Sequence, residues 1–103
     1  MNAYIVNASF EADKEHEAYL ARKCQHDYEE SQGAKGLLSF DIWKREHPAT
    51  VEYVLVSKWT SKEDFKAWIS REEHVQGHKE QRQHPVEDRP KLTKKLSYFE
   101  AVL

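Results

Sequence analysis

Six histidines are the residues of this sequence best suited to chemistry, because a neutral imidazole binds metals and transfers protons near neutral pH. They are His16, His26, His47, His74, His78 and His84. Surface exposure is the ordinary expectation for each of them. His74 and His78 stand four residues apart, so one face of a helix would present both imidazoles to a metal. No Cys or Asp ligand pair accompanies them in the sequence, which disfavours a zinc site.

Asn7 and the three tryptophans are the other side chains with two competing interpretations. Asn7 interrupts an apolar segment that is typical of a strand, where asparagine is disfavoured. A buried amide must form hydrogen bonds, so it either bonds to neighbouring backbone or is a donor that points into a pocket. Trp68 follows Phe65 by three residues, which fits both ordinary core packing and a pocket wall. Trp43 and Trp59 are expected to pack in the core or between subunits.

Those side chains must be positioned by secondary structure, and the chain predicts the element order β-α-β-β-α-β. The strands are expected over residues 4–10, 37–46, 51–59 and 92–103, and the helices over residues 13–30 and from residue 60 to about 78. Gly33 and Gly36 end the first helix, and Thr60 and Ser61 each precede an acidic residue by three positions, which is a capping-box pattern. The order predicts a single α+β domain over residues 1–103, ferredoxin-like, with an antiparallel sheet and the helices on one face.

The third and fourth predicted strands are apolar on both faces. Residues 53–56 read Tyr-Val-Leu-Val, and residues 96–103 also place apolar side chains on both sides. Helices cover only one face of the sheet in a two-layer monomer, so the other face needs a partner. We expect a homodimer packed sheet to sheet. The alternative is that the polar segment 79–91 folds over the sheet.

Composition disfavours several classes of partner and cofactor. The net charge is -2 and no long basic run occurs, so nucleic-acid binding has little support. The apolar runs are too short for a transmembrane helix, and no membrane partner is expected. A single cysteine, Cys24, and an amino terminus unlike a signal peptide favour a cytoplasmic protein. With three glycines and no glycine-rich phosphate loop, a flavin or nicotinamide site is not expected.

The sequence resembles the antibiotic biosynthesis monooxygenase superfamily, and within it the Isd-type heme-degrading monooxygenases. The resemblance rests on Asn7, on residues 35–40, and most strongly on residues 56–68 and 72–78. In that family a tryptophan precedes the iron-ligating histidine by ten residues, and Trp68 and His78 keep this spacing. One departure is Lys-Gly-Leu at residues 35–37, where the family usually has Pro-Gly-Phe.

The resemblance implies a heme-degrading monooxygenase built as a dimeric α/β-barrel. In this interpretation His78 ligates the heme iron, Trp68 presses on the porphyrin and distorts it, and Asn7 donates a hydrogen bond near the distal ligand. Heme would be both substrate and cofactor. O2 and an external electron donor, such as an unidentified reductase, would complete the oxidative opening of the porphyrin and release iron.

Two alternatives to heme degradation stay open from the sequence. The first is a cofactor-independent monooxygenase of the same superfamily that acts on an aromatic or quinol substrate. The second is a non-catalytic heme-binding stress protein. His78 at the family spacing favours the heme readings, because only they require an iron ligand there.

Overall fold

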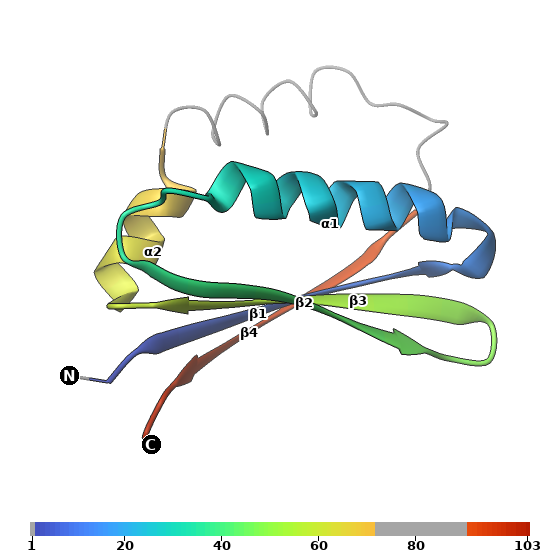
Figure 1. The fold of residues 1–103 in the computed structure, drawn as a ribbon. Helices are drawn as coiled ribbons and strands as arrows, with labels where there is room; N and C mark the ends of the chain where they lie inside the picture. The colour runs from blue at the N-terminus through green and yellow to red at the C-terminus, as the bar shows by residue number, and fades with distance from the viewer. Residues whose placement is uncertain (1, 72–90) are drawn as a thin grey trace.

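The computed structural model describes residues 2–71 and 91–103, and these form one antiparallel sheet with helices on one side (Figure 1). The elements in order are β1 (Tyr4–Asp13), a 3-10 helix η1 (Lys14–His16), α1 (Glu17–Ser31), β2 (Leu37–Glu46), β3 (Thr50–Trp59), α2 (Lys62–Ile69) and β4 (Thr93–Glu100). The strand order is β2-β3-β1-β4, and all neighbouring pairs are antiparallel. The predicted α+β, ferredoxin-like fold is confirmed.

Helix α1 packs on the sheet through residues four positions apart. Leu20 and Cys24 are both fully buried there, as helical periodicity predicts. The helix begins at Glu17 rather than at residue 13, because β1 stays paired with β3 as far as Asp13 opposite Thr50. Burial raises the pKa of the Cys24 thiol to about 11, so this cysteine acts as a small apolar core residue.

The two faces of the sheet differ, and β1 shows how they are assigned. Its pairing with β3 runs without a bulge, so successive side chains alternate strictly between the faces. Val6, Phe10 and Ala12 are buried, and Phe10 and Ala12 belong to the core cluster with Leu20 and Cys24 of α1. Even-numbered residues of β1 therefore face the helices, and odd-numbered ones point the other way.

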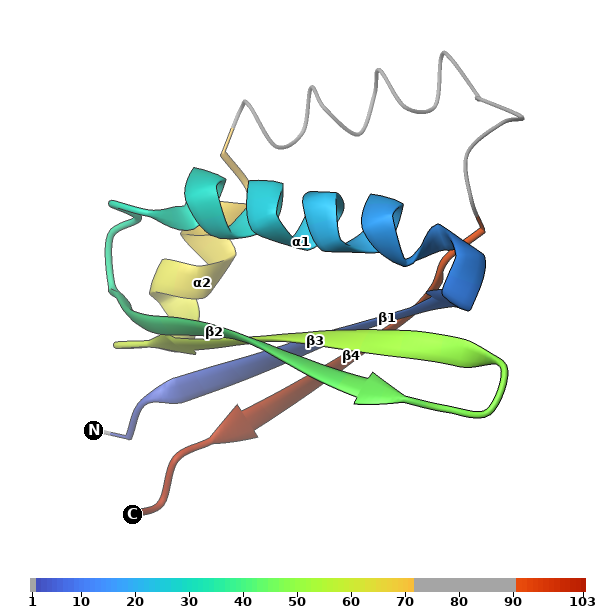
Figure 2. The ribbon, with the colours of Figure 1, turned by 45° about the vertical axis from the view of Figure 1, so that its right-hand side comes forward.

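We call the side of the sheet away from the helices the open face. By cross-strand pairing it carries the odd-numbered residues of β1 and β4, the even-numbered residues of β3, and the odd-numbered residues of β2 from Ser39 onward. Two views show both helices on the same side of the sheet, with no described element below the open face (Figures 1 and 2). Trp43 is 56% exposed on this face and Phe99 is 52% exposed.

Strand β2 differs from its prediction at one residue. Strict alternation along the predicted strand over residues 37–46 places Leu38 on the same face as Phe40 and Ile42, and the latter two do pack against the core. A register shift between Leu37 and Ser39 takes Leu38 out of this alternation, and the side chain is exposed. In the described ranges no helix is long and apolar enough to cross a membrane.

Candidate functional site

Helix α2 positions Trp68, and its sequence explains where it begins. The Ser61 hydroxyl accepts a hydrogen bond from the Asp64 backbone N–H at 3.2 Å, which confirms the predicted cap. From this start Phe65 and Trp68 reach the sheet side of the helix. Their ring centroids lie 5.7 and 6.4 Å, respectively, from that of Trp59, which is buried at the end of β3. Trp68 is itself half-buried, so it lines the edge of the core rather than its centre.

Arg71 covers one face of the Trp68 ring. Its guanidinium carbon lies 3.4 Å from the ring centroid, in cation–π geometry. Two further contacts hold it there: Nη1 donates to the Trp68 carbonyl at 2.7 Å, and Nη2 donates to Glu30 of α1 at 2.5 Å. Arg71 is not among the site residues predicted from the sequence. The position three after Trp68 was a local signal, but Glu30 is 41 residues away in the chain.

The structure does not bring Asn7 and Trp68 together. Asn7 pairs with Val56 and Ser97 on the open face, whereas Trp68 contacts Trp59 on the helix side. The side-chain Oδ1 of Asn7 is shielded from solvent and accepts no hydrogen bond from the described chain. Asn7 thus lies on the same face of the sheet as Ile5, and the sheet itself separates that face from α2.

His78, the third predicted site residue, lies outside the described residues. The same holds for His74, for His84 and for the predicted continuation of the second helix. The ten-residue spacing between Trp68 and His78 thus remains an observation on the sequence.

A hollow of about 610 Å³ opens beside the aromatic residues at the start of β1. It is lined by Asn2, Tyr4, Thr60, Ser61, Lys62, Glu63, Tyr98, Phe99 and Glu100. Tyr4 stacks on Tyr98 with centroids 6.1 Å apart, and it also contacts Phe65 of α2 at 6.0 Å. The volume of this hollow lies within the range of small-molecule sites. Its walls combine flat aromatic rings with charged side chains at the edges.

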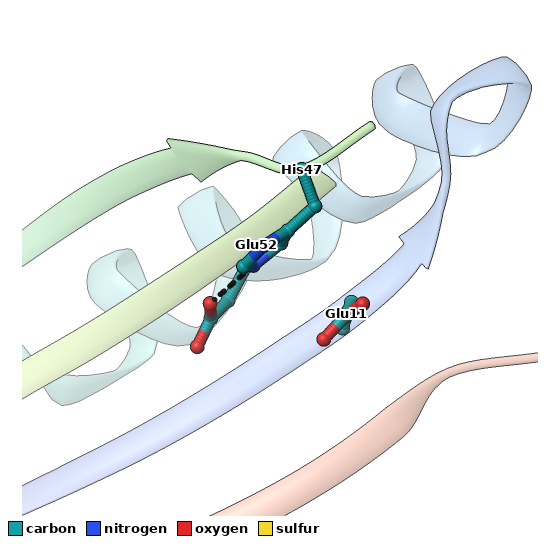
Figure 3. Close-up of side chains that lie close together, drawn as sticks. All are labelled: Glu11, His47 and Glu52. Atoms are coloured by element: carbon teal, nitrogen blue, oxygen red, sulfur yellow. Dashed lines mark hydrogen bonds and ion pairs between the residues drawn. The ribbon is translucent and has the colours of Figure 1, made fainter. Parts of the chain in front are cut away.

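A second group of chemical side chains lies on the open face near the β2–β3 turn. Figure 3 shows His47 directed at Glu52, with Glu11 beside them. The buried Glu52 carboxylate accepts hydrogen bonds from Ser9 at 2.5 Å, from His47 at 2.9 Å and from Arg45 at 2.8 Å. These bonds, with Ser9 and His47 contributing most, lower the pKa of Glu52 to about 2.

The ligand atoms of Glu11, His47 and Glu52 lie within 4.8 Å of one another, so a metal site is the obvious question. Both oxygens of Glu52 already accept hydrogen bonds, and the Arg45 guanidinium contributes a positive charge at one of them. The Glu11 carboxylate also accepts a bond from Thr50 at 2.5 Å. The cluster is therefore an ion-pair network whose hydrogen bonds are satisfied. The signal for this cluster in the sequence was the strand alternation that places Glu52 opposite Glu11.

A comparison with protein families assigns the fold. The model of the family described as Antibiotic biosynthesis monooxygenase matches residues 3–80, about three quarters of the chain. The chain belongs to this family. The resemblance seen in the sequence is thereby confirmed at the level of the superfamily. No curated protein matches the chain.

Solved structures of other proteins share the fold at low sequence identity. A proposed antibiotic biosynthesis monooxygenase from Deinococcus radiodurans is 16% identical with a TM-score of 0.70, and the match covers 95% of this chain and 91% of that one. The heme-degrader MhuD from Mycobacterium tuberculosis, solved with two hemes bound in its active site, is 21% identical with a TM-score of 0.68, covering 97% and 96%. These likenesses establish the architecture, and chemistry has to be argued from the residues.

Proposed function

We propose that this family member is a heme-degrading monooxygenase in which Trp68 and His78 form the heme site. The observation that carries the proposal is the placement of Trp68: α2 holds it half-buried against Trp59, ten residues before a histidine. The likeness to MhuD supports the same chemistry. O2 and electrons from an external donor are part of the proposal, and a cytoplasmic location fits the single buried cysteine.

The described residues fit a flat apolar ligand on the helix side of the sheet. Phe65 and Trp68 are partly exposed there and pack against the buried Trp59, and partly exposed aromatic side chains of this kind bind large planar groups. When bound, heme supplies the oxygen-activating chemistry, while the protein supplies ligation, orientation and a dry surface. A ligand that stacks on the covered face of Trp68 has to displace Arg71. Asn7 lies across the sheet and is left out of this site.

We also propose that the protein is a homodimer that buries the open face. Trp43 and Phe99 support this, because large apolar side chains that are half exposed on a sheet face mark an interaction surface. The apolar Val54 and Val56 lie between them on the central strand β3.

Hemin titration followed by absorption spectroscopy tests the proposed function. We expect a Soret band that saturates near one heme per subunit, and loss of the band with ascorbate and O2. His78→Ala should abolish the axial-ligand signature, whereas the matched variant His74→Ala should leave it in place. A chain that yields no saturable Soret band refutes the proposal, and a reversed pair of variants refutes the ligand assignment.

The aromatic hollow favours one second candidate, a cofactor-independent monooxygenase acting on an aromatic or quinol substrate. Tyr4 and Tyr98 would hold a single aromatic ring there without any iron ligand. O2 consumption with a quinol in the absence of hemin, unaffected by His78→Ala, would establish this reading. A Soret band without bleaching would instead indicate a non-catalytic heme-binding protein.

A further inference from the structure

Arg71 occupies the position over the Trp68 ring that a flat ligand of the proposed site would take. Its guanidinium carbon lies 3.4 Å from the ring centroid, which is close contact between two flat groups. A planar guanidinium stacks on an aromatic face in a way that a lysine ammonium does not. Only 18% of the Arg71 side chain is exposed, so the folded chain packs the arginine in this place.

A carboxylate on the neighbouring helix holds Arg71 over the ring. Nη2 donates to Glu30 near the end of α1 at 2.5 Å, and the ends of the two helices lie side by side in both views (Figures 1 and 2). Nη1 donates to the Trp68 carbonyl at 2.7 Å. The arginine thus joins α1 to α2 and covers Trp68 at the same time. A ligand that takes this face of the indole has to displace the guanidinium and its bond to Glu30.

The pair with Glu30 leaves part of the Arg71 guanidinium unused. Arginine binds a carboxylate most strongly with two parallel N–H donors, one to each oxygen. Glu30 accepts from Nη2 through Oε1 alone, and its other oxygen, Oε2, lies 3.3 Å from His26. Nε of Arg71 has no partner among the described residues, and it is closed off from solvent while the guanidinium lies on the ring. Moving the guanidinium off the ring opens Nε, so that another carboxylate can bind Nε and Nη2 together.

We infer that Arg71 is a specificity-determining residue of the proposed site, which selects flat ligands that carry a carboxylate. Held by Glu30, the guanidinium covers Trp68 in the free protein. A flat ligand with a carboxylate takes the ring and gives the displaced guanidinium a bidentate partner in place of Glu30. A flat ligand without a carboxylate displaces the guanidinium but returns no bond to it, so it binds more weakly. The inference rests on the proposed function, because it concerns the ligand of the same site.

Titration of hemin and of hemin dimethyl ester in the same mixed solvent tests the choice of ligand, because the ester lacks the free carboxylates. The ratio of the two dissociation constants, ester over hemin, should fall at least about fivefold in Arg71→Ala, the value expected for one partly exposed charged pair. Glu30→Ala frees the guanidinium without removing it, so both ligands should bind about threefold more tightly and the ratio should stay. Lys66→Ala on α2 and Glu29→Ala on α1 remove exposed charges from the same two helices, and these matched controls should change neither affinity.

Acrylamide quenching of tryptophan fluorescence tests the covered ring in the absence of any ligand. In a Trp43→Phe background the remaining tryptophans are Trp59 and Trp68. Trp59 is only 1% exposed, so the quenching reports on Trp68. Arg71→Ala and Glu30→Ala should each raise the quenching constant in this background, whereas the two control variants should leave it unchanged.

The outcomes separate this inference from the proposed function. If both porphyrins bind and their ratio is the same in Arg71→Ala as in the parent, the inference is wrong and the heme site stands. Equal quenching of Trp68 with and without Arg71 also overturns the inference, because the ring is then open in solution. If neither porphyrin gives a saturable Soret band, the proposed function fails and the inference fails with it. Should Arg71→Ala not fold by circular dichroism, Arg71→Gln, which can still donate to the Trp68 carbonyl, decides by the same two measurements.

Discussion

Replacing Gly36 with alanine should destabilise the protein more than the same change at Gly33, although both glycines have φ near +85°. A β-carbon at Gly33 meets no atom within 4 Å, so Gly33→Ala adds only the cost of the left-handed backbone, about 1–2 kcal/mol. A β-carbon at Gly36 would lie 2.6 Å from Cγ and 2.7 Å from Cβ of Asp64. Asp64 must then move. It bonds to the Thr60 hydroxyl, and its backbone N–H bonds to the cap of α2.

The magnitude follows from adding the two effects. Loss of a helix cap costs about 1 kcal/mol, so Gly36→Ala should lower the free energy of unfolding by about 2–3 kcal/mol in total. Urea unfolding monitored by tryptophan fluorescence measures both variants, since Trp59 and Trp68 report on α2. Equal losses for the two variants would refute the reasoning, because they would show that Asp64 yields to the new methyl group without disturbing the cap.

Two further predictions concern the site and the open face. Trp68→Ala should still bind hemin, about 1 kcal/mol more weakly because an aromatic wall is lost, but it should lose bleaching with ascorbate and O2. Trp68→Phe should be intermediate. A parental bleaching rate in the folded alanine variant would disprove a role for the indole in turnover. The folded-state pKa of Glu52 is depressed from 4.5 to about 2, so its stabilisation is present above pH 4.5 and is lost as the pH falls toward 2. With an allowance for solvent screening, the free energy of unfolding should fall by about 2 kcal/mol over this pH range. In Glu52→Gln the free energy of unfolding should depend less on pH over the same range.

The element order and the turns of this protein could be predicted because their signals are local. The turn at residues 47–49 forms, with the His47 N–H donating to the Thr50 carbonyl at 3.0 Å. Ser61 caps α2, and Gly33 and Gly36 adopt the positive φ angles that end α1 and open β2. Each of these features is decided by residues within a few positions of one another.

The facing of β1 could not be predicted, because both sets of alternating residues contain apolar side chains. Ile5 and Val6 are equally suited to a core, and only the contact of Phe10 with α1 decides which set faces the helices. That decision moves Asn7 to the open face. The ion pair between Arg71 and Glu30 could not be predicted from the sequence either, because it joins the ends of two helices that only the tertiary fold brings together.

The two edge strands of the sheet decide how far association can proceed. β2 and β4 form the edges, and an unpaired edge can recruit further strands into an open-ended assembly. Each edge carries two consecutive basic residues, Lys44 and Arg45 on β2, and Lys94 and Lys95 on β4. Lysines on an edge strand disfavour growth of the sheet into a polymer, because a strand added beside them has to displace or bury their charged ends. Face-to-face association, in contrast, uses up its surface in a single contact and closes at two copies.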